Sequence, residues 1–450
     1  MKIKRRKVIR LTLLLCFVIG LFYGWYEYRI FMAVPSTRLL AGSYYPEMPP
    51  DHHHIYIQLP IDHQNKSFGN FTDFYLLSPN FKPGDPVVFQ LYDNQQEAVG
   101  LIKTAGDFKE FYNRIGKGIS YVLIGNRGVS PTLFPEVFNK DGKQNYKLAL
   151  KLYGSDEQIE DIEFVRQDMA RRGLLPKDGK IMLYGGSGGG VLIQQYISKY
   201  GEHVSRALVE STGAPDIAHK NGMTFTNPFY SSNPAAAESY YRLLKEGKSS
   251  PNLAFLLFKL GIDGKVQSQT DILKGENSFF DFSDRFLYIK NWLSISQNFS
   301  VINTIFRSPS ELEVKVRIWE LIGADLVNYH PASAKEVNLL YEWGRVIMAD
   351  FLDAYKMGKI KVYEFNINRA GYSGDMMVWA NTGDQDFGPH IGRLIGAAYP
   401  YSKLAIFEEA SHHVQTRSEY QLGFVRAFFN SGLNAVETQR YFNDARQKNK

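Results

Sequence analysis

Short runs of apolar residues recur along the chain between polar and glycine-rich turns. Several runs are continuous rather than alternating, which is typical of strands buried on both faces of a parallel sheet. The runs that predict strands are residues 55–59, 71–77, 87–92, 121–124, 180–184, 207–210, 376–380 and 404–407. Helical stretches lie between and after them, most clearly at residues 157–172, 191–200, 418–429 and 434–446. This alternation predicts an α/β fold with a mainly parallel sheet flanked by helices.

The alternation stops between residues 213 and 375. This stretch favours helices and is rich in aromatic residues, and strand-like runs resume after it. We therefore interpret it as an inserted helical cap over the edge of the sheet where open α/β proteins bind ligands. Most of its aromatic residues are expected to form the core of the cap itself. The predicted organisation is a basic tail and membrane anchor over 1–33, a core in two parts over 34–212 and 376–450, and the cap over 213–375.

The N-terminus carries a membrane signal. Six basic residues precede the first acidic residue, Glu27, and residues 11–26 form an uncharged apolar run that ends in aromatic residues. A run of this length approaches the ~20 residues that a helix needs to span a bilayer. Positive charge before the run predicts a cytoplasmic N-terminus and an extracytoplasmic body, periplasmic or on the cell surface. The alternative is a cleaved signal peptide and a secreted protein.

The composition excludes other classes of protein. Beyond the basic tail the chain carries 46 basic and 46 acidic residues, so it lacks the basic excess that nucleic-acid binding requires. Cys16 is the only cysteine and lies in the apolar run. The body therefore has no disulfide, cysteine nucleophile or cysteine metal site. We expect no metal and no cofactor. Oligomeric state stays open.

The sharpest chemical motif is Gly185-Gly186-Ser187-Gly188-Gly189, which follows an apolar strand and precedes a helix. This is the G-x-S-x-G nucleophile elbow in its required context of strand, sharp turn and helix. The helix behind Ser187 directs backbone N–H groups at a developing oxyanion, and the Gly188 amide is the natural first donor. A glycine-rich turn can also hold a phosphate, but the Lys-Ser/Thr of a P-loop does not follow here.

A serine nucleophile needs a base and an orienting acid, in the chain order Ser, Asp, His. The strand at 376–380 leads to Asp384 and Asp386, and the strand at 404–407 leads to His412 and His413. Parallel strands bring their carboxyl ends to one edge of a sheet, so these side chains are expected beside Ser187. Sequence alone leaves a choice within each pair.

The motifs resemble those of α/β-hydrolases, and in particular the proline iminopeptidase and tripeptidyl aminopeptidase group of serine peptidases. Residues 125–130 resemble the Asp-x-Arg-Gly-x-Gly-x-Ser turn of that group, 161–166 its Asp-x-x-x-x-Arg helix, 200–204 its Tyr-Pro-Glu-x-Val and 57–63 its entry strand. The resemblance favours Asp386 as the acid and His412 as the base. It also implies a cap after the sixth strand and an aminopeptidase or related activity without a cofactor.

One departure concerns the oxyanion hole. After the strand at 87–91 the family usually has a glycine-rich loop, whereas this chain has Tyr92-Asp93-Asn94-Gln95-Gln96. A backbone amide near Asn94 is the expected second donor, although a loop without glycine has less conformational freedom to present it.

The predicted activity is acyl transfer to water by Ser187, Asp386 and His412, with Gly188 and Asn94 as oxyanion donors. An exopeptidase needs cap acids to pair with the ammonium of a peptide substrate, and the candidates are Glu238, Glu320, Asp325 and Glu342. A carboxylesterase or lipase, acting on a small-molecule substrate, needs no such acid. The alternative from another class is a membrane-tethered binding protein with a degraded site.

Overall fold

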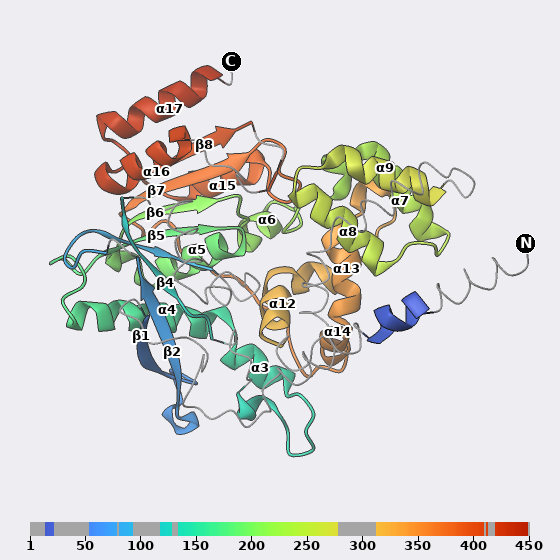
Figure 1. The fold of residues 1–450 in the computed structure, drawn as a ribbon, viewed down its shortest axis with the longest axis horizontal. Coiled ribbons are helices and arrows are strands. Elements are labelled where there is room, and N and C mark those ends of the chain that lie inside the picture. Colours follow the sequence, from blue (N-terminus) through green and yellow to red (C-terminus); the bar gives the residue numbers. More distant parts are fainter. Residues whose placement is uncertain are drawn as a thin grey trace, which may run out of the picture.

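The computed structural model describes residues 14–21, 54–78, 81–92, 118–127, 134–277, 312–408, 411–412 and 419–448. Within these ranges a single eight-stranded sheet forms the centre of the molecule, with the strand order β1-β2-β4-β3-β5-β6-β7-β8 (Figure 1). Its strands are β1 (His54–Pro60), β2 (Asn70–Leu77), β3 (Val87–Gln90), β4 (Ser120–Ile124), β5 (Ile181–Gly186), β6 (Val204–Glu210), β7 (Asp375–Asn381) and β8 (Ser402–Phe407). All eight strands were predicted from the apolar runs.

The sheet is parallel from β4 through β8, and only β2 pairs in the antiparallel sense, with β1 and with β4. The central strands β3 and β4 are buried along their whole length, which explains their continuous apolar sequence. The helices of the core are α3 (Tyr146–Leu152), α4 (Ser155–Arg171), α5 (Gly188–Tyr200), α15 (Pro389–Ala398), α16 (Glu419–Ser431) and α17 (Val436–Lys448). Helix α5 packs against β5 and β6, and α15 packs against β7 and β8.

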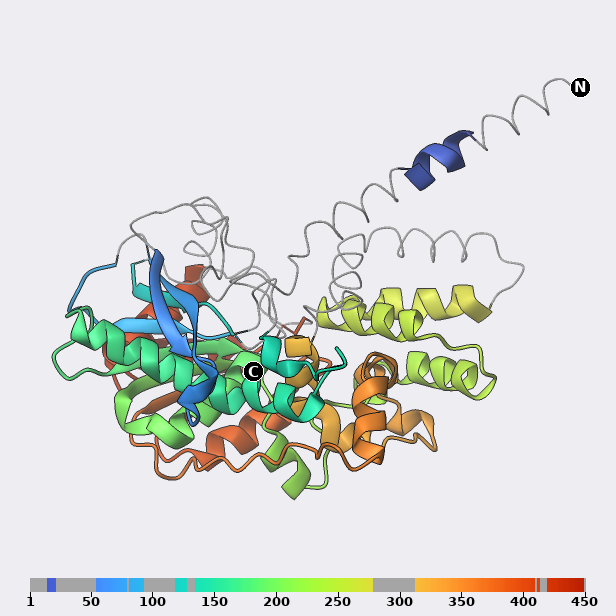
Figure 2. The same cartoon turned by 90° about the horizontal axis from the view of Figure 1, so that it is seen from below.

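The chain between β6 and β7 forms a helical cap. Its helices are α6 (Pro215–Lys220), α7 (Pro234–Lys245), α8 (Pro251–Ile262), α9 (Val266–Asn277), α12 (Leu312–Leu326), α13 (Leu339–Ile347) and α14 (Ala349–Lys356). Short 3-10 helices lie at η1 (Lys66–Phe68), η3 (Pro135–Val137), η4 (Gly201–His203), η5 (Phe229–Ser231) and η6 (Ala334–Glu336). Figures 1 and 2 both show α7, α8, α9 and α13 on one side of the sheet.

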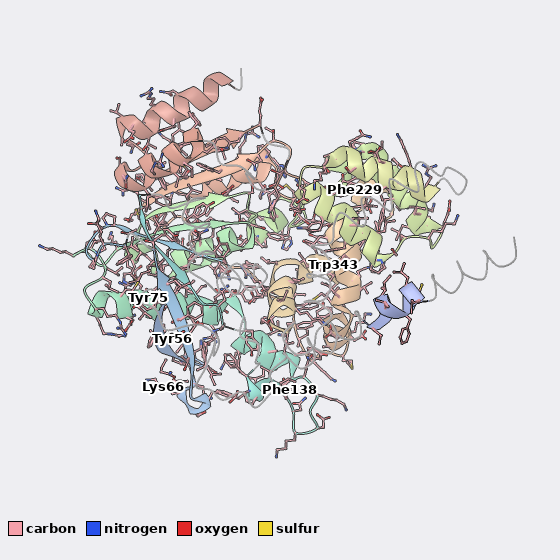
Figure 3. All side chains as sticks on the ribbon, viewed as in Figure 1. Tyr56, Lys66, Tyr75, Phe138, Phe229 and Trp343 are labelled. Atoms are coloured by element: carbon pink, nitrogen blue, oxygen red, sulfur yellow. The ribbon has the colours of Figure 1, made fainter. Side chains whose placement is uncertain are left out.

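Aromatic side chains form the interior of the cap, as their apolar character predicts. Phe229 and Trp343, labelled in Figure 3, are both buried. The ring of Trp343 lies 4.9 Å from that of Phe255 and so joins α13 to α8. These cap residues belong to the same hydrophobic cluster as the core of the sheet.

The predicted membrane segment lies largely outside the described residues. Residues 14–21 are helical and exposed. Within the described ranges, no helix combines the length and the apolar character needed to cross a membrane.

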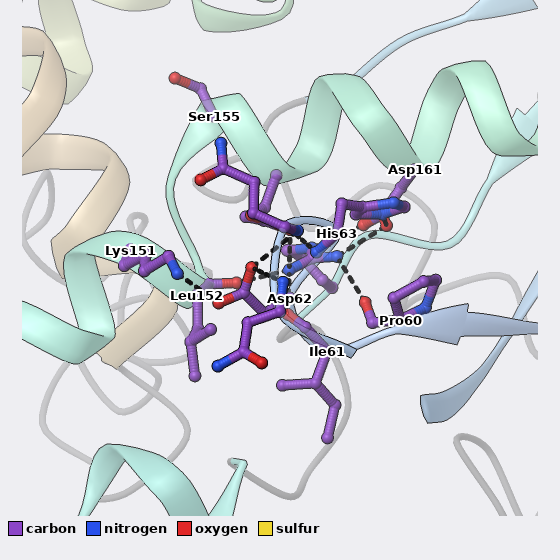
Figure 4. A network of polar contacts seen from close by, with 12 residues as sticks. Pro60, Ile61, Asp62, His63, Lys151, Leu152, Ser155 and Asp161 are labelled. Carbon is purple, nitrogen blue, oxygen red and sulfur yellow. Dashed lines mark hydrogen bonds and ion pairs between the residues drawn. The ribbon is translucent and has the colours of Figure 1, made fainter. Parts of the chain in front are cut away.

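Arg127, from the motif after β4, is completely buried and holds several elements together. Its guanidinium donates to both carboxylate oxygens of Asp161 on α4, at 2.6 and 2.7 Å. It also donates to the carbonyls of Leu152 at 2.7 Å, Ile61 at 3.0 Å and Pro60 at 3.2 Å. Figure 4 shows the labelled residues of this network converging between β1 and α4. The arginine of the motif therefore has a structural role.

Arg127→Met is predicted to destabilise the fold by about 3 to 5 kcal/mol, because it leaves the buried Asp161 carboxylate without its main partner. Urea unfolding of the domain measures this change. Arg171→Met is the matched control, since Arg171 pairs with Asp168 on the same helix but is 61% exposed, and its loss is expected to cost less than about 1 kcal/mol. Equal costs for the two variants would contradict the assignment.

Candidate active site

Ser187 occupies a strained turn between β5 and α5. Its backbone has φ 51° and ψ −125°, a region that side-chain-bearing residues rarely adopt and that concentrates at functional sites. Gly185 permits this geometry, because a Cβ there would lie 2.9 Å from the Leu91 carbonyl oxygen and 3.0 Å from the Gly189 backbone. Ser187 is half-buried and stands directly before the first turn of α5. This is the predicted elbow.

Hydrogen bonds hold the Ser187 backbone on both sides. Its N–H donates to the carbonyls of Glu210 at 2.9 Å and Ser211 at 3.2 Å. Its carbonyl accepts from the Thr212 hydroxyl at 2.6 Å. Because a trans peptide is planar, fixing the Ser187 carbonyl also fixes the direction of the Gly188 N–H on the opposite side of the same peptide. Thr212, which the sequence analysis missed, thus orients the predicted first oxyanion donor.

Gly190 makes room for that contact. A Cβ at this position would lie 2.6 Å from the Thr212 hydroxyl oxygen. Ser211, the residue before Thr212, also has a positive φ, 44°. Residues with a positive φ therefore follow both β5 and β6, at the point where Ser187 is held.

Asp384, and not the predicted Asp386, is the carboxylate in contact with His412. The Nδ1 atom of His412 lies 2.9 Å from Oδ1 and 3.0 Å from Oδ2 of Asp384. Both residues are buried. A carboxylate on Nδ1 leaves Nε2 as the ring nitrogen that exchanges a proton with a serine hydroxyl. Asp384 therefore makes the contact that the resemblance to α/β-hydrolases led us to expect of Asp386.

Hydrogen bonds in the turn after β7 explain why Asp384, rather than Asp386, contacts His412. The Asp384 carboxylate accepts hydrogen bonds from the backbone N–H groups of Asp386, at 2.8 Å, and Phe387, at 3.1 Å. These bonds are typical of an aspartate that opens a tight turn, and they aim its carboxylate inward. Asp386 lies further along the turn, where its carbonyl accepts from the Asn227 N–H of the cap at 3.0 Å.

Asp386 remains electrostatically coupled to the pair. Burial raises the pKa of its carboxyl to about 7, the nearby His412 opposes the rise, and Asp384 adds to it. Burial alone would lower the pKa of His412, but the Asp384 carboxylate and its hydrogen bond more than compensate, so that this pKa lies above 6.5. The buried carboxylates of Asp386 and Glu210 act on His412 in the same direction. Protonated His412 is therefore stabilised, as a general base requires once it has accepted a proton.

Asn381, at the end of β7, connects the segments that carry His412 and Ser187. Its side-chain amide donates to the carbonyls of Ser411 at 3.1 Å and His412 at 3.2 Å, and to the Ser211 hydroxyl at 3.3 Å. Because the Ser211 carbonyl accepts from Ser187, two residues link the histidine and serine segments. The predicted Ser187 and His412 thus belong to one hydrogen-bonded region at the carboxyl edge of the sheet.

The predicted second oxyanion donor, Asn94, lies outside the described residues, as does His413. The last described residue before that loop is Tyr92, whose carbonyl accepts from the side-chain amides of Asn126 at 2.9 Å and Gln158 at 3.0 Å. Asn126 stands where the family motif usually has Asp. Its amide therefore holds the Tyr92 carbonyl, just after the end of β3.

Arg317 brings the cap to the nucleophile helix. This arginine of α12 is 1% exposed and donates to the Gly188 carbonyl at 3.3 Å and to Glu320 at 2.8 Å. Glu320 also accepts from the N–H of Ser155 at 2.8 Å. The sequence signal for this pair was its i,i+3 spacing, which is too common to single out. Glu320 is consequently occupied by protein partners.

The other acids proposed for substrate binding lie in different settings. Glu238 is exposed on α7. Asp325 accepts from the Tyr341 hydroxyl at 2.7 Å and lies 2.9 Å from His219. Glu342 is buried, and that burial raises the pKa of its carboxyl. None of the four is shown beside Ser187.

A cavity of about 970 Å³ lies between the cap and the turn after β7. Thr382, Asp384 and Gln385 line it from the core, and Asn227 and Tyr329 line it from the cap. Ser187 is not among its lining residues. The cavity therefore adjoins the acid rather than the nucleophile. Among the residues described, no group of His, Cys, Asp and Glu side chains is arranged to hold a metal ion.

Asp384→Asn is predicted to lower kcat by about three to four orders of magnitude, as expected when the orienting carboxylate of a triad is lost. Asp386→Asn keeps the Asp384 contact and is expected to stay within about tenfold of the wild type. Steady-state kinetics on a hydrolysed ester compares the two. If Asp386→Asn instead lowers kcat more than Asp384→Asn does, Asp386 is the orienting acid, as the sequence analysis favoured.

The pH dependence of kcat/KM provides a second test of the contact between Asp384 and His412. Only neutral His412 accepts a proton, so wild-type kcat/KM is expected to fall as the pH drops through the raised pKa of His412, above 6.5. Asp384→Asn removes the main group that raises this pKa, so the acidic limb of its residual activity should move to lower pH. An unmoved limb would place the titration on another group.

No protein-family model and no curated protein matches this sequence. Solved structures do resemble it. A probable hydrolytic enzyme from Pseudomonas aeruginosa PAO1 has a TM-score of 0.40 and 10% identity, and the match covers 84% of this chain and 95% of that one. An α/β fold family hydrolase from Bacillus anthracis str. Sterne has a TM-score of 0.34 and 15% identity, covering 87% and 99%.

A monoacylglycerol lipase from Paleococcus ferrophilus has a TM-score of 0.34 and 12% identity, covering 80% of this chain and 97% of that one. The fold assignment does not depend on these distant likenesses. An eight-stranded sheet that is antiparallel only at β2, with a strained serine between β5 and α5 and a cap between β6 and β7, is the α/β-hydrolase fold.

Proposed function

We propose that this protein is a serine hydrolase in which Ser187, His412 and Asp384 form the catalytic triad. The observation that carries the proposal is that one edge of the sheet holds both a strained elbow serine and a buried histidine whose Nδ1 contacts a carboxylate at 2.9 Å. If the turn at position 187 served packing alone, a glycine would fit it without strain. A serine in this strained backbone conformation therefore favours a functional role for its side chain.

In the proposed reaction the Ser187 hydroxyl oxygen attacks a substrate carbonyl carbon while His412 accepts the hydroxyl proton. The tetrahedral oxyanion is held by the Gly188 N–H, whose direction Thr212 fixes. His412 then returns the proton to the leaving group as the carbonyl–leaving-group bond breaks. Water, deprotonated by His412, then attacks the acyl carbon. The ester bond to the Ser187 oxygen breaks as His412 returns the proton to that oxygen, which releases the carboxylic acid. Asp384 orients the imidazole and stabilises its cationic form throughout.

We propose a carboxylic ester as the substrate class. An exopeptidase needs a free carboxylate for the substrate ammonium, and among the described cap acids Glu320 and Asp325 are already bound by Arg317 and Tyr341. Glu342 has a raised pKa, and Glu238 is exposed on the outside of α7. The exopeptidase remains the alternative, because Glu342 keeps one buried carboxylate oxygen without a hydrogen-bond partner in the described structure.

A fluorophosphonate probe is expected to label the wild-type protein and to leave Ser187→Ala unlabelled. It should label His412→Ala at least about a hundredfold more slowly, because a serine without its base is a weak nucleophile. Gel fluorescence measures the labelling. Hydrolysis of p-nitrophenyl butyrate should then exceed that of an aminoacyl p-nitroanilide, and the reverse order supports the exopeptidase. A folded wild-type domain that is not labelled would instead support a binding protein with a degraded site.

We further propose that residues 11–26 anchor the chain in a membrane with the catalytic domain on the extracytoplasmic side. The basic residues before this apolar run support that orientation. The full chain is expected to stay with membranes after carbonate extraction and to be digested by protease added to spheroplasts. Release of a shortened chain into the medium would favour the cleaved signal peptide.

A further inference from the structure

The cap reaches the catalytic histidine through its backbone. The carbonyl of Ile262, at the end of α8, accepts the N–H of His412 at 2.8 Å. A buried hydrogen bond between main-chain groups leaves little freedom in the position of either segment. The end of α8 thus fixes where the His412 backbone lies.

The next helix of the cap reaches the acid turn. Gln269 of α9 is completely buried, and its side-chain amide donates to the Gln385 side-chain oxygen at 2.8 Å and to the Leu257 carbonyl at 2.7 Å. Its own oxygen accepts from the Asn233 amide at 3.2 Å. Gln385 directly follows Asp384 in the chain. Gln269 therefore ties α8 and α9 to the residue beside the catalytic acid.

Gly261 shows how closely these parts approach. A Cβ at Gly261 would lie 1.4 Å from the Gln385 side-chain oxygen, so α8 lies directly against this side chain and a larger residue at position 261 would displace it. The cap hairpin formed by α8 and α9 (Pro251–Asn277) thus contacts both the acid turn and the histidine segment, within nine residues of its own chain from Gly261 to Gln269.

We propose that this hairpin is a positioning element of the triad, in which Gln269, through Gln385, and the Ile262 carbonyl together hold Asp384 and His412 at hydrogen-bonding distance. The acid turn and the histidine segment follow β7 and β8, which are paired up to Asn381 and Phe407. Beyond these strand ends, the hairpin adds one contact to each segment. A displacement of about 1 Å at a catalytic group can cost about a hundredfold in rate. The α8–α9 hairpin consequently cannot open as a lid without disturbing the base.

The inference rests on the proposed hydrolase activity, so wild-type labelling by the fluorophosphonate probe comes first. Gln269→Leu approximately keeps the size of the side chain and removes its hydrogen bonds to Gln385, Leu257 and Asn233. Its labelling rate is expected to fall between about tenfold and a hundredfold. Gln267→Leu is the matched control, because Gln267 is an exposed residue of the same helix whose side chain donates to Asp271, and it should label at the wild-type rate.

The pH profile of labelling separates positioning from stability. The charged groups that face His412 are Asp384 and Asp386 from the acid turn and Glu210 from the end of β6. If Gln269→Leu loosens the Asp384 contact, the acidic limb of its labelling rate moves to lower pH. A merely structural role lowers the urea midpoint of the variant and leaves this limb in place, and that result would overturn the inference.

Gln385→Leu provides a second approach from the other side of the bond, since Gln269 then keeps its contact with Leu257 and the cap stays packed. The same slower labelling and shifted limb are expected. If Gln385→Leu folds and is labelled at the wild-type rate with the wild-type pH profile, the inference is contradicted. This holds even if Gln269→Leu does not fold. If the wild type itself is not labelled, the proposed function fails instead, and the two failures are distinguishable.

Discussion

The hydrogen bond between His412 and Asp384 is the interaction on which the proposed chemistry of this molecule depends. A buried imidazole is neutral by preference, because burial disfavours its cation. The adjacent carboxylate reverses that preference and fixes the tautomer, so that the ring can accept a proton and hold the resulting charge. Three neighbouring segments hold the pair in this arrangement. The turn after β7 aims Asp384 inward, Asn381 holds the His412 carbonyl, and the cap holds the His412 N–H.

The nucleophile depends on a second constraint, which is strain maintained by hydrogen bonds. Ser187 keeps a positive φ because its N–H and carbonyl are both engaged by the end of β6, from Glu210 to Thr212. Glycines on either side let β5 and α5 approach closely enough for this to occur. The cap adds Arg317 at the Gly188 carbonyl. The cap therefore contacts both halves of the proposed site, and we expect it to contribute to the catalytic geometry together with the α/β core.

The fold could be predicted from sequence because burial on both faces leaves a strong signal. The continuous apolar runs of β3, β4 and β5 have few alternatives, and the glycines around Ser187 mark a turn that few other motifs require. The acid could not be predicted in the same way. Asp384 and Asp386 are two residues apart on one turn, and the choice between them depends on backbone hydrogen bonds from Asp386 and Phe387 that no sequence pattern records. Contacts across the cap, such as Gln269 with Gln385, join residues more than a hundred positions apart and carry no local signal.

The central claim is that Asp384 orients His412, and proton NMR of the domain tests it most directly. Below the pKa of His412, a hydrogen bond from Nδ1–H to a buried carboxylate shifts that proton far downfield of the amide region. We predict such a resonance in the wild type, its loss in Asp384→Asn and its retention in Asp386→Asn. A resonance that survives in Asp384→Asn and disappears in Asp386→Asn would contradict the account.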